Sequence, residues 1–121
     1  MGKTVIVGSV PKAYRYAHQA AVMLEERDFD FIPLGIQEGE VLGREILNVN
    51  NRPKIDDVET LTLYINPTRQ KDWYDYMISL SPKRIIFNPG TENQEFKIKA
   101  EKAGIECIEA CTLVMLSTGV Y

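Results

Sequence analysis

The chain has 121 residues, of which 45% are hydrophobic, enough for one compact domain with a core and too few for two. Its net charge of −3 argues against a surface built to bind nucleic acid or an anionic membrane. No apolar run reaches the roughly 20 residues that span a bilayer, and the N-terminal residues lack a signal-type hydrophobic core. Two cysteines are too few for a disulfide scaffold. We therefore expect a single cytoplasmic domain over residues 1–121, without nucleic-acid or membrane partners.

The first half of the chain alternates between strand and helix patterns. Residues 5–7 form a β-branched run that is closed by Gly8, as in a strand buried on both faces. Apolar residues then recur three and four positions apart over 14–27, which predicts an amphipathic helix. Residues 29–34 predict a second strand. The polar and glycine-containing stretch 37–53 predicts a long connection, with a weak short strand near 45–47.

The second half continues the alternation. Residues 61–65 predict a third strand, and Asn66 and Pro67 are suited to the N-cap and first position of a helix that reaches about residue 80. Strands are predicted over 84–87 and 105–108, with a helix over 92–103 between them and a short helix over 112–116 at the end. This order predicts an α/β fold of the Rossmann-like, three-layer αβα type, with a parallel five-stranded sheet and helices on both faces.

In such a sheet, ligands bind at the loops that follow the carboxyl ends of the strands. Gly8 allows a tight turn and a close approach of a ligand, and the N-terminus of the following helix attracts anions. The dinucleotide fingerprint GxGxxG is absent because Val10 and Ala13 replace its second and third glycines. A Walker A motif is also absent. The first loop alone is therefore weak evidence for a phosphate site.

Several strand-end motifs occur together in one order. The segments are GSVP with Tyr14 after the first strand, IPLGIQEGEVLG at the second, LYINP at the third, FNPGTEN at the fourth, and IECIEAC near the end. Taken together, they resemble the small CoA-binding proteins and the CoA-binding domain of the succinyl-CoA synthetase alpha subunit. The resemblance covers essentially the whole chain, and its specificity comes from the order of the motifs.

This resemblance implies that coenzyme A, or an acyl-CoA, binds through the strand-end loops. The phosphates are expected at the first loop, on Gly8, Ser9, Pro11, Lys12 and Arg15. The adenosine is expected against Pro33 and Leu34, and the third strand is expected to flank the ligand with Ile65, Asn66 and Pro67. The pantetheine arm is expected to reach Asn88, Pro89 and Gly90.

The chain shows no Ser-His-Asp set, acid and base pair or metal motif, which favours a non-catalytic binding or regulatory module. A nucleotide sensor of the NAD type is an alternative, although Pro33, Leu34 and Gly35 stand where such a protein needs an acidic residue. Two further alternatives are an enzyme that uses Cys111 or His18 on a bound thioester, and an interaction protein that has lost its ligand. A homodimer is a general expectation for a small soluble protein.

Other conspicuous side chains have ordinary structural explanations beside functional ones. His18 has the spacing of a packed or surface helix residue, and two cysteines with one histidine cannot form a four-ligand zinc site. Cys111 matches a cysteine of the resembled family, which implies a thiol near the ligand. Trp73 is expected either to cover the core or to face a partner, and Arg69 either to add a cation to the site or to lie on an exposed helix face.

Overall fold

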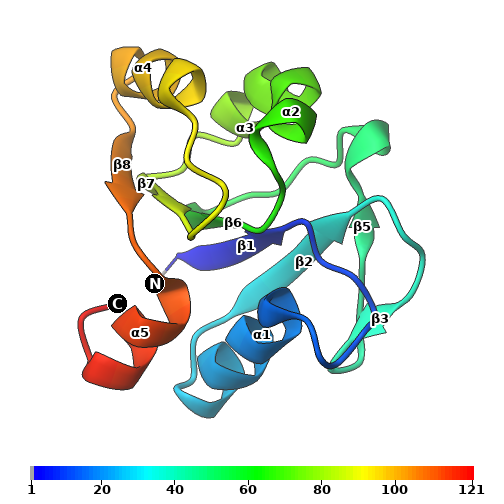
Figure 1. Cartoon of the computed structure of the whole chain (residues 1–121). Coiled ribbons are helices and arrows are strands. Elements are labelled where there is room, and N and C mark those ends of the chain that lie inside the picture. Colours follow the sequence, from blue (N-terminus) through cyan, green and yellow to red (C-terminus); the bar gives the residue numbers. More distant parts are fainter. Residues whose placement is uncertain (1) are drawn as a thin grey trace.

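The computed structural model describes residues 2–121 as a six-stranded parallel sheet with helices on both faces (Figure 1). The sheet has the strand order β5-β2-β1-β6-β7-β8. Its strands are β1 (Lys3–Val7), β2 (Phe31–Gly35), β5 (Leu47–Asn48), β6 (Val58–Leu63), β7 (Arg84–Phe87) and β8 (Glu106–Glu109). The predicted parallel α/β architecture is confirmed.

The predicted count of five strands is wrong, because the connection after β2 contains a sixth. In β5, Leu47 and Asn48 pair with Leu34 and Gly35 of β2. The same connection forms an antiparallel hairpin of β3 (Glu40–Val41) and β4 (Arg44–Glu45). Each of these strands has two residues, which is too short for a clear alternating pattern, and the sequence indicates only a single weak strand near 45–47, where β4 and β5 lie. A 3₁₀ turn, η1 (Val49–Asn51), follows β5.

The helices form two layers, and successive residues of β1 face one layer or the other. α1 (Tyr16–Glu26) and α5 (Thr112–Thr118) cover one face, and α2 (Pro67–Gln70), α3 (Tyr74–Ser79) and α4 (Gln94–Lys102) cover the other (Figure 1). Ile6 packs in a cluster with Leu24 of α1, whereas Val5 and Val7 pack in a second cluster with Met77 and Phe96. The sheet is therefore buried on both faces, as the continuous apolar runs predicted.

The predicted helix over 67–80 is broken into three pieces. A 3₁₀ turn, η2 (Lys71–Trp73), lies between α2 and α3. Side chains three residues apart eclipse in a 3₁₀ turn, and here this geometry directs Gln70 and Trp73 inward together. The Gln70 amide donates to the carbonyl oxygens of Ile65 and Thr91 at 3.0 and 2.8 Å, so the break is fixed by buried hydrogen bonds.

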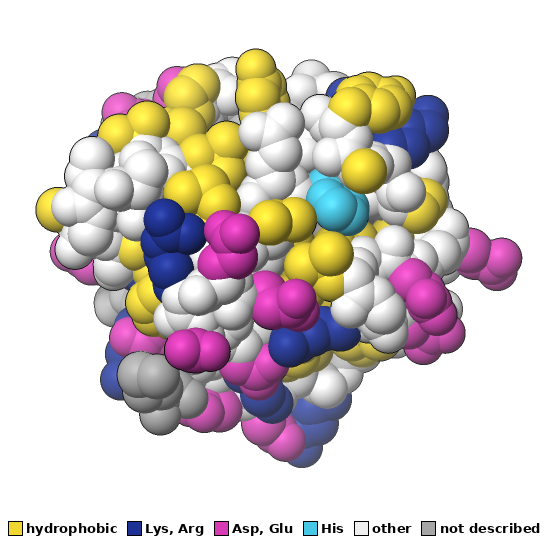
Figure 2. Space-filling view, turned by 90° about the horizontal axis from the view of Figure 1, so that it is seen from below, with side chains coloured by type: hydrophobic (Ala, Val, Ile, Leu, Met, Phe, Trp, Pro, Cys, Tyr) yellow, Lys and Arg dark blue, Asp and Glu magenta, His cyan; other side chains and the backbone are white. Residues whose placement is uncertain are grey.

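The described residues contain no helix that is long and apolar enough to cross a membrane. Seen from the side of α1 and α5, acidic and basic side chains are mixed among apolar ones (Figure 2). No continuous basic surface appears among the described residues on this face.

Candidate functional site

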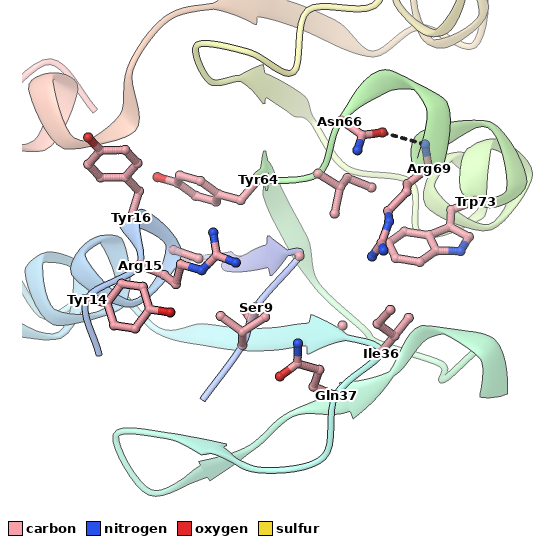
Figure 3. A pocket seen from close by; sticks show the side chains of 15 residues that line it. Ser9, Tyr14, Arg15, Tyr16, Ile36, Gln37, Tyr64, Asn66, Arg69 and Trp73 are labelled. Carbon is pink, nitrogen blue, oxygen red and sulfur yellow. Dashed lines mark hydrogen bonds between the residues drawn. The ribbon is translucent and has the colours of Figure 1, made fainter. Parts of the chain in front are cut away.

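A cavity of about 640 Å³ lies where the chain leaves the sheet in two opposite directions (Figure 3). β1 and β6 are neighbours, but the chain continues from β1 to β2 on one side and from β6 to β7 on the other. Such a reversal leaves a crevice at the carboxyl ends of the strands. The cavity is lined by Gly8, Ser9, Val10, Tyr14, Arg15, Tyr16, Ala17, Gly35, Ile36, Gln37, Tyr64, Ile65, Asn66, Arg69 and Trp73.

Two glycines allow the strand ends to meet closely beneath the cavity. Gly8 has a φ of +97°, and a Cβ added to it would lie 2.6 Å from Cγ2 of Ile65. A Cβ on Gly35 would lie 2.4 Å from the carbonyl oxygen of Ser9. Both distances are shorter than any normal carbon contact, so a side chain at either position would push the loops apart.

The backbone N–H groups of the first loop are already bonded within the protein. Those of Gly8 and Ser9 both donate to the carbonyl oxygen of Leu34, at 2.8 and 3.0 Å, and the Ser9 hydroxyl donates to the carbonyl oxygen of Ile6 at 2.8 Å. The first N–H groups of α1 have no partner within the helix, and Tyr16 and Ala17 of this turn line the cavity. Unbonded backbone donors at the cavity lining are therefore found at the start of α1 and not at the Gly-Ser pair.

Two arginines enter the cavity from opposite walls. Figure 3 shows Arg15 beside the start of α1, and Arg69 on α2 across the cavity. Among residues 2–121, neither guanidinium forms an ion pair or a side-chain hydrogen bond, and Arg15 lies 5.8 Å from the ring centre of Tyr14. The described lining contains no aspartate or glutamate. The cavity is thus electropositive in a protein whose net charge is −3.

Aromatic side chains form much of the remaining wall. Tyr14 and Tyr16 are largely exposed at its rim, with 71% and 69% of their surface accessible. Trp73 is buried and lies beside Arg69 (Figure 3). The ring of Tyr64 lines the cavity, but its hydroxyl is buried and makes no hydrogen bond of good geometry with any described residue. Burial raises the pKa of Tyr64 to about 12, and the nearby hydroxyls of Thr62 and Thr112 oppose this rise in part.

The structure brings five of the predicted site residues together. Gly8, Ser9, Arg15, Ile65 and Asn66 all line the cavity. The Asn66 side chain accepts a hydrogen bond from the Arg69 N–H at 3.0 Å, as expected for the N-cap of α2.

The other predicted site residues lie outside the cavity lining. Pro11 and Lys12 are exposed, and Pro11 lies so close to Gly39 that a Cβ on Gly39 would approach it to 2.7 Å. Pro33 and Leu34 are buried within β2, and Pro67 is half-buried at the start of α2. Contact of these residues with a ligand stays a prediction.

The loop after β7 is also separate from the cavity lining. Pro89 and Gly90 are exposed, whereas Asn88 is buried. The Asn88 amide donates to the Thr62 hydroxyl at 2.7 Å and to the carbonyl oxygen of Leu63 at 2.9 Å, and its oxygen accepts from the N–H of Thr112 at 2.8 Å. Asn88 therefore holds the ends of β6 and β7 against α5, and its contact with a ligand also stays a prediction.

The reactive side chains named from the sequence do not line the cavity. His18 is half-buried on α1, and Cys111 is half-buried at the N-cap of α5. Burial, with the nearby Glu101 as a smaller cause, raises the pKa of the Cys107 thiol to about 11, so this thiol is neutral at pH 7. No cluster of potential metal ligands occurs within the described part of the chain.

Sequence reasoning missed part of the lining. It allowed two roles for Arg69, and the structure places this residue in the cavity. The spacing of Arg69 and Trp73, four residues apart, is a sequence signal for a shared face. Tyr64, Ile36 and Gln37 also line the cavity. Tyr64 lies within the predicted strand 61–65, and Ile36 and Gln37 follow the predicted strand 29–34 by two and three residues. Tyr14 and Tyr16 carried no signal that separates a cavity rim from an ordinary helix start.

Comparison with known proteins gives both a family and a set of similar structures. A family model described as "CoA binding domain" matches residues 2–117. A crystal structure of an uncharacterized protein is 51% identical, with a TM-score of 0.96, and the match covers 100% of this chain and 98% of that one. A hypothetical protein from Pyrococcus horikoshii OT3 is 26% identical, with a TM-score of 0.82 and coverage of 96% and 82%. The comparison with curated proteins gives no match.

Proposed function

Because the chain belongs to the CoA binding domain family, we propose that it binds coenzyme A or an acyl-CoA in the cavity at the ends of β1 and β6. The cavity volume of about 640 Å³ lies within the range of roughly 300–1,000 Å³ that is common for small-molecule sites. The protein acts as a binding or regulatory module, because no cluster of catalytic side chains lines the described cavity.

One observation carries this proposal. Arg15 and Arg69 lie in a lining without acidic residues, and neither forms an ion pair with a described residue. Coenzyme A carries a pyrophosphate and a separate ribose phosphate, so it needs concentrated positive charge to bind an acidic protein. Arg15 lies directly before the first turn of α1, where free N–H groups and the helix dipole favour an anion. We therefore assign the pyrophosphate to Arg15 and the first turn of α1.

The residues at the end of β2 disfavour NAD as the ligand. Dinucleotide-binding folds of the NAD type hold the ribose hydroxyls with an acidic residue at this position. Gly35, Ile36 and Gln37 occupy it here, and none of the three carries a carboxylate.

Calorimetric titration of the purified protein with coenzyme A, and in parallel with NAD, tests the proposal. We expect micromolar binding of coenzyme A and much weaker binding of NAD. Arg15→Gln should weaken binding of coenzyme A about tenfold, which corresponds to about 1.4 kcal/mol for one lost charge-assisted contact. The exposed Lys102 at the end of α4 lies outside the lining, so Lys102→Gln is a charge-matched control that should bind as the wild type does.

The absence of heat, together with an unchanged melting temperature in excess coenzyme A, would overturn the proposal. The fold would then serve a protein partner, and a search for binding proteins would follow. Equal weakening by Arg15→Gln and Lys102→Gln would instead indicate a general charge effect, and it would remove the pyrophosphate from the position that we assign to it.

A further inference from the structure

Arg69 and Trp73 form a second polar position in the cavity, separate from the one around Arg15. Both side chains come from the segment α2–η2, four residues apart, and the Arg69 side chain lies beside the indole ring in Figure 3. Trp73 is 7% exposed, so its ring is held in place by the core. The bond from the Arg69 N–H to the Asn66 side chain fixes the start of α2 under Arg69. The backbone of Arg69 is thus fixed by Asn66, and its side chain lies beside the fixed ring of Trp73.

The guanidinium of Arg69 faces the end of β2. Figure 3 shows its tip above Ile36 and Gln37, which follow Gly35 at the end of that strand. In nucleotide-binding sheets of this kind, the end of the second strand lies next to the ribose. An acidic residue there binds free ribose hydroxyls, whereas a nearby arginine accommodates a phosphate on the ribose. Neither Ile36 nor Gln37 carries a charge, and Arg69 is the one cation of the described lining on this side.

We propose that Arg69 binds the phosphomonoester on the ligand's ribose, and that it makes this cavity selective for nucleotides that carry such a phosphate. This inference rests on the proposed function and adds a specificity-determining residue to it. A ligand with two separate anionic groups would place one group at each arginine, which accounts for the positions of Arg15 and Arg69 on opposite walls. A guanidinium matches a single phosphate group through two parallel hydrogen bonds, and no described carboxylate of the lining competes for it.

The position of Trp73 supplies a direct measurement. The chain contains a single tryptophan, and this residue lines the cavity beside Arg69. Its fluorescence should therefore change when a ligand enters, and it would report occupancy at this wall without a label.

The decisive experiment compares coenzyme A with dephospho-coenzyme A, which lacks only the ribose phosphate, by calorimetry and tryptophan fluorescence. We expect the wild type to prefer coenzyme A at least tenfold, and Arg69→Gln to bring the ratio of the two affinities close to one. Arg15→Gln should weaken both ligands and leave the ratio as in the wild type. Lys71→Gln, which removes an exposed cation two residues from Arg69 and outside the lining, should keep both affinities.

Two results overturn this assignment while the proposed function stands. In the first, wild type and Arg69→Gln bind coenzyme A with the same preference over dephospho-coenzyme A. In the second, Arg69→Gln weakens both ligands by the same factor, which would place Arg69 on a group that the two ligands share. If the wild type binds neither ligand, the proposed function fails, and the assignment of Arg69 fails with it.

Discussion

Gly8 and Gly104 both adopt left-handed backbone conformations, with φ of +97° and +85°, but they differ in their surroundings. A Cβ on Gly8 would meet Ile65 at 2.6 Å, whereas a Cβ on Gly104 would meet no atom within 4 Å. Left-handed backbone costs an L-residue about 1–2 kcal/mol, and overpacking costs about 1–3 kcal/mol more. We expect Gly104→Ala to lower the free energy of unfolding by about 1 kcal/mol and Gly8→Ala by about 2–4 kcal/mol.

Denaturant unfolding of the two variants measures this difference. Since the conformational cost is nearly the same at both positions, Gly104→Ala serves as the control, and the excess loss in Gly8→Ala reports the contact with Ile65. Equal losses in the two variants would show that the loop yields to a methyl group. The end of β1 would then not be rigidly packed against the end of β6.

At the scale of elements, the hairpin β3–β4 contains a strained turn. Its two turn residues, Leu42 and Gly43, have φ of +51° and +80°, a combination that asparagine and glycine adopt far more readily than leucine and glycine do. Leu42 is 38% exposed, so its side chain buries only part of its surface in return. We expect Leu42→Asn to raise the free energy of unfolding by about 0.5–1 kcal/mol, since it relieves part of this strain. A shift in the denaturant midpoint measures the gain.

Leu42→Val is the matching control for that turn. Valine keeps the apolar character but is β-branched, and it tolerates a positive φ less well than leucine. Its midpoint should fall below that of the wild type. If the midpoint of Leu42→Asn also fell, the contacts of the leucine would outweigh the strain, and the hairpin would depend on them for its packing.

The long elements and the C-terminal helix could be predicted from the sequence, but for the short strands it indicates only one, near residues 45–47, where the structure has β4 and β5. Runs such as residues 5–7 and 85–87 are apolar throughout because both faces of the sheet are covered, and this pattern is visible in a single sequence. The strands of two residues, and the break at η2, depend on contacts with distant segments, such as the bond from Gln70 to Thr91. No local pattern encodes such contacts.

The candidate site, too, could be predicted only in part from the sequence. The strand-end loops were predicted to surround one place, and Gly8, Arg15 and Asn66 do meet there. The resemblance also places the loop of Asn88 at the ligand, yet the Asn88 amide is bonded to Thr62 and Leu63. Which strand ends face the cavity depends on the order of strands in the sheet, and a linear sequence does not display that order.

For the whole molecule, the buried hydroxyl of Tyr64 predicts a loss of stability at alkaline pH. Burial raises its pKa from 10.0 to about 12, so the folded protein favours the neutral phenol more than the unfolded chain does. Below pH 10 the Tyr64 phenol is neutral in both states and the free energy of unfolding keeps its full value. This contribution is lost as the pH rises from 10 to 12, where the phenol ionises in the unfolded chain first. Two pKa units correspond to about 3 kcal/mol. Tyr64→Phe has no phenol to ionise, so its free energy of unfolding should fall less over this range.

The measurement is denaturant unfolding at a series of pH values between 8 and 12, on the wild type, Tyr64→Phe and Tyr14→Phe. Tyr14 is 71% exposed, so removing its hydroxyl should leave the alkaline loss as it is in the wild type. The Cys107 thiol, whose pKa is raised to about 11, contributes equally in all three proteins and cancels in the comparison. If Tyr64→Phe lost as much stability as Tyr14→Phe, the Tyr64 phenol would have to ionise in the folded protein at an ordinary pH. The wall of the cavity would then be open to water at that point.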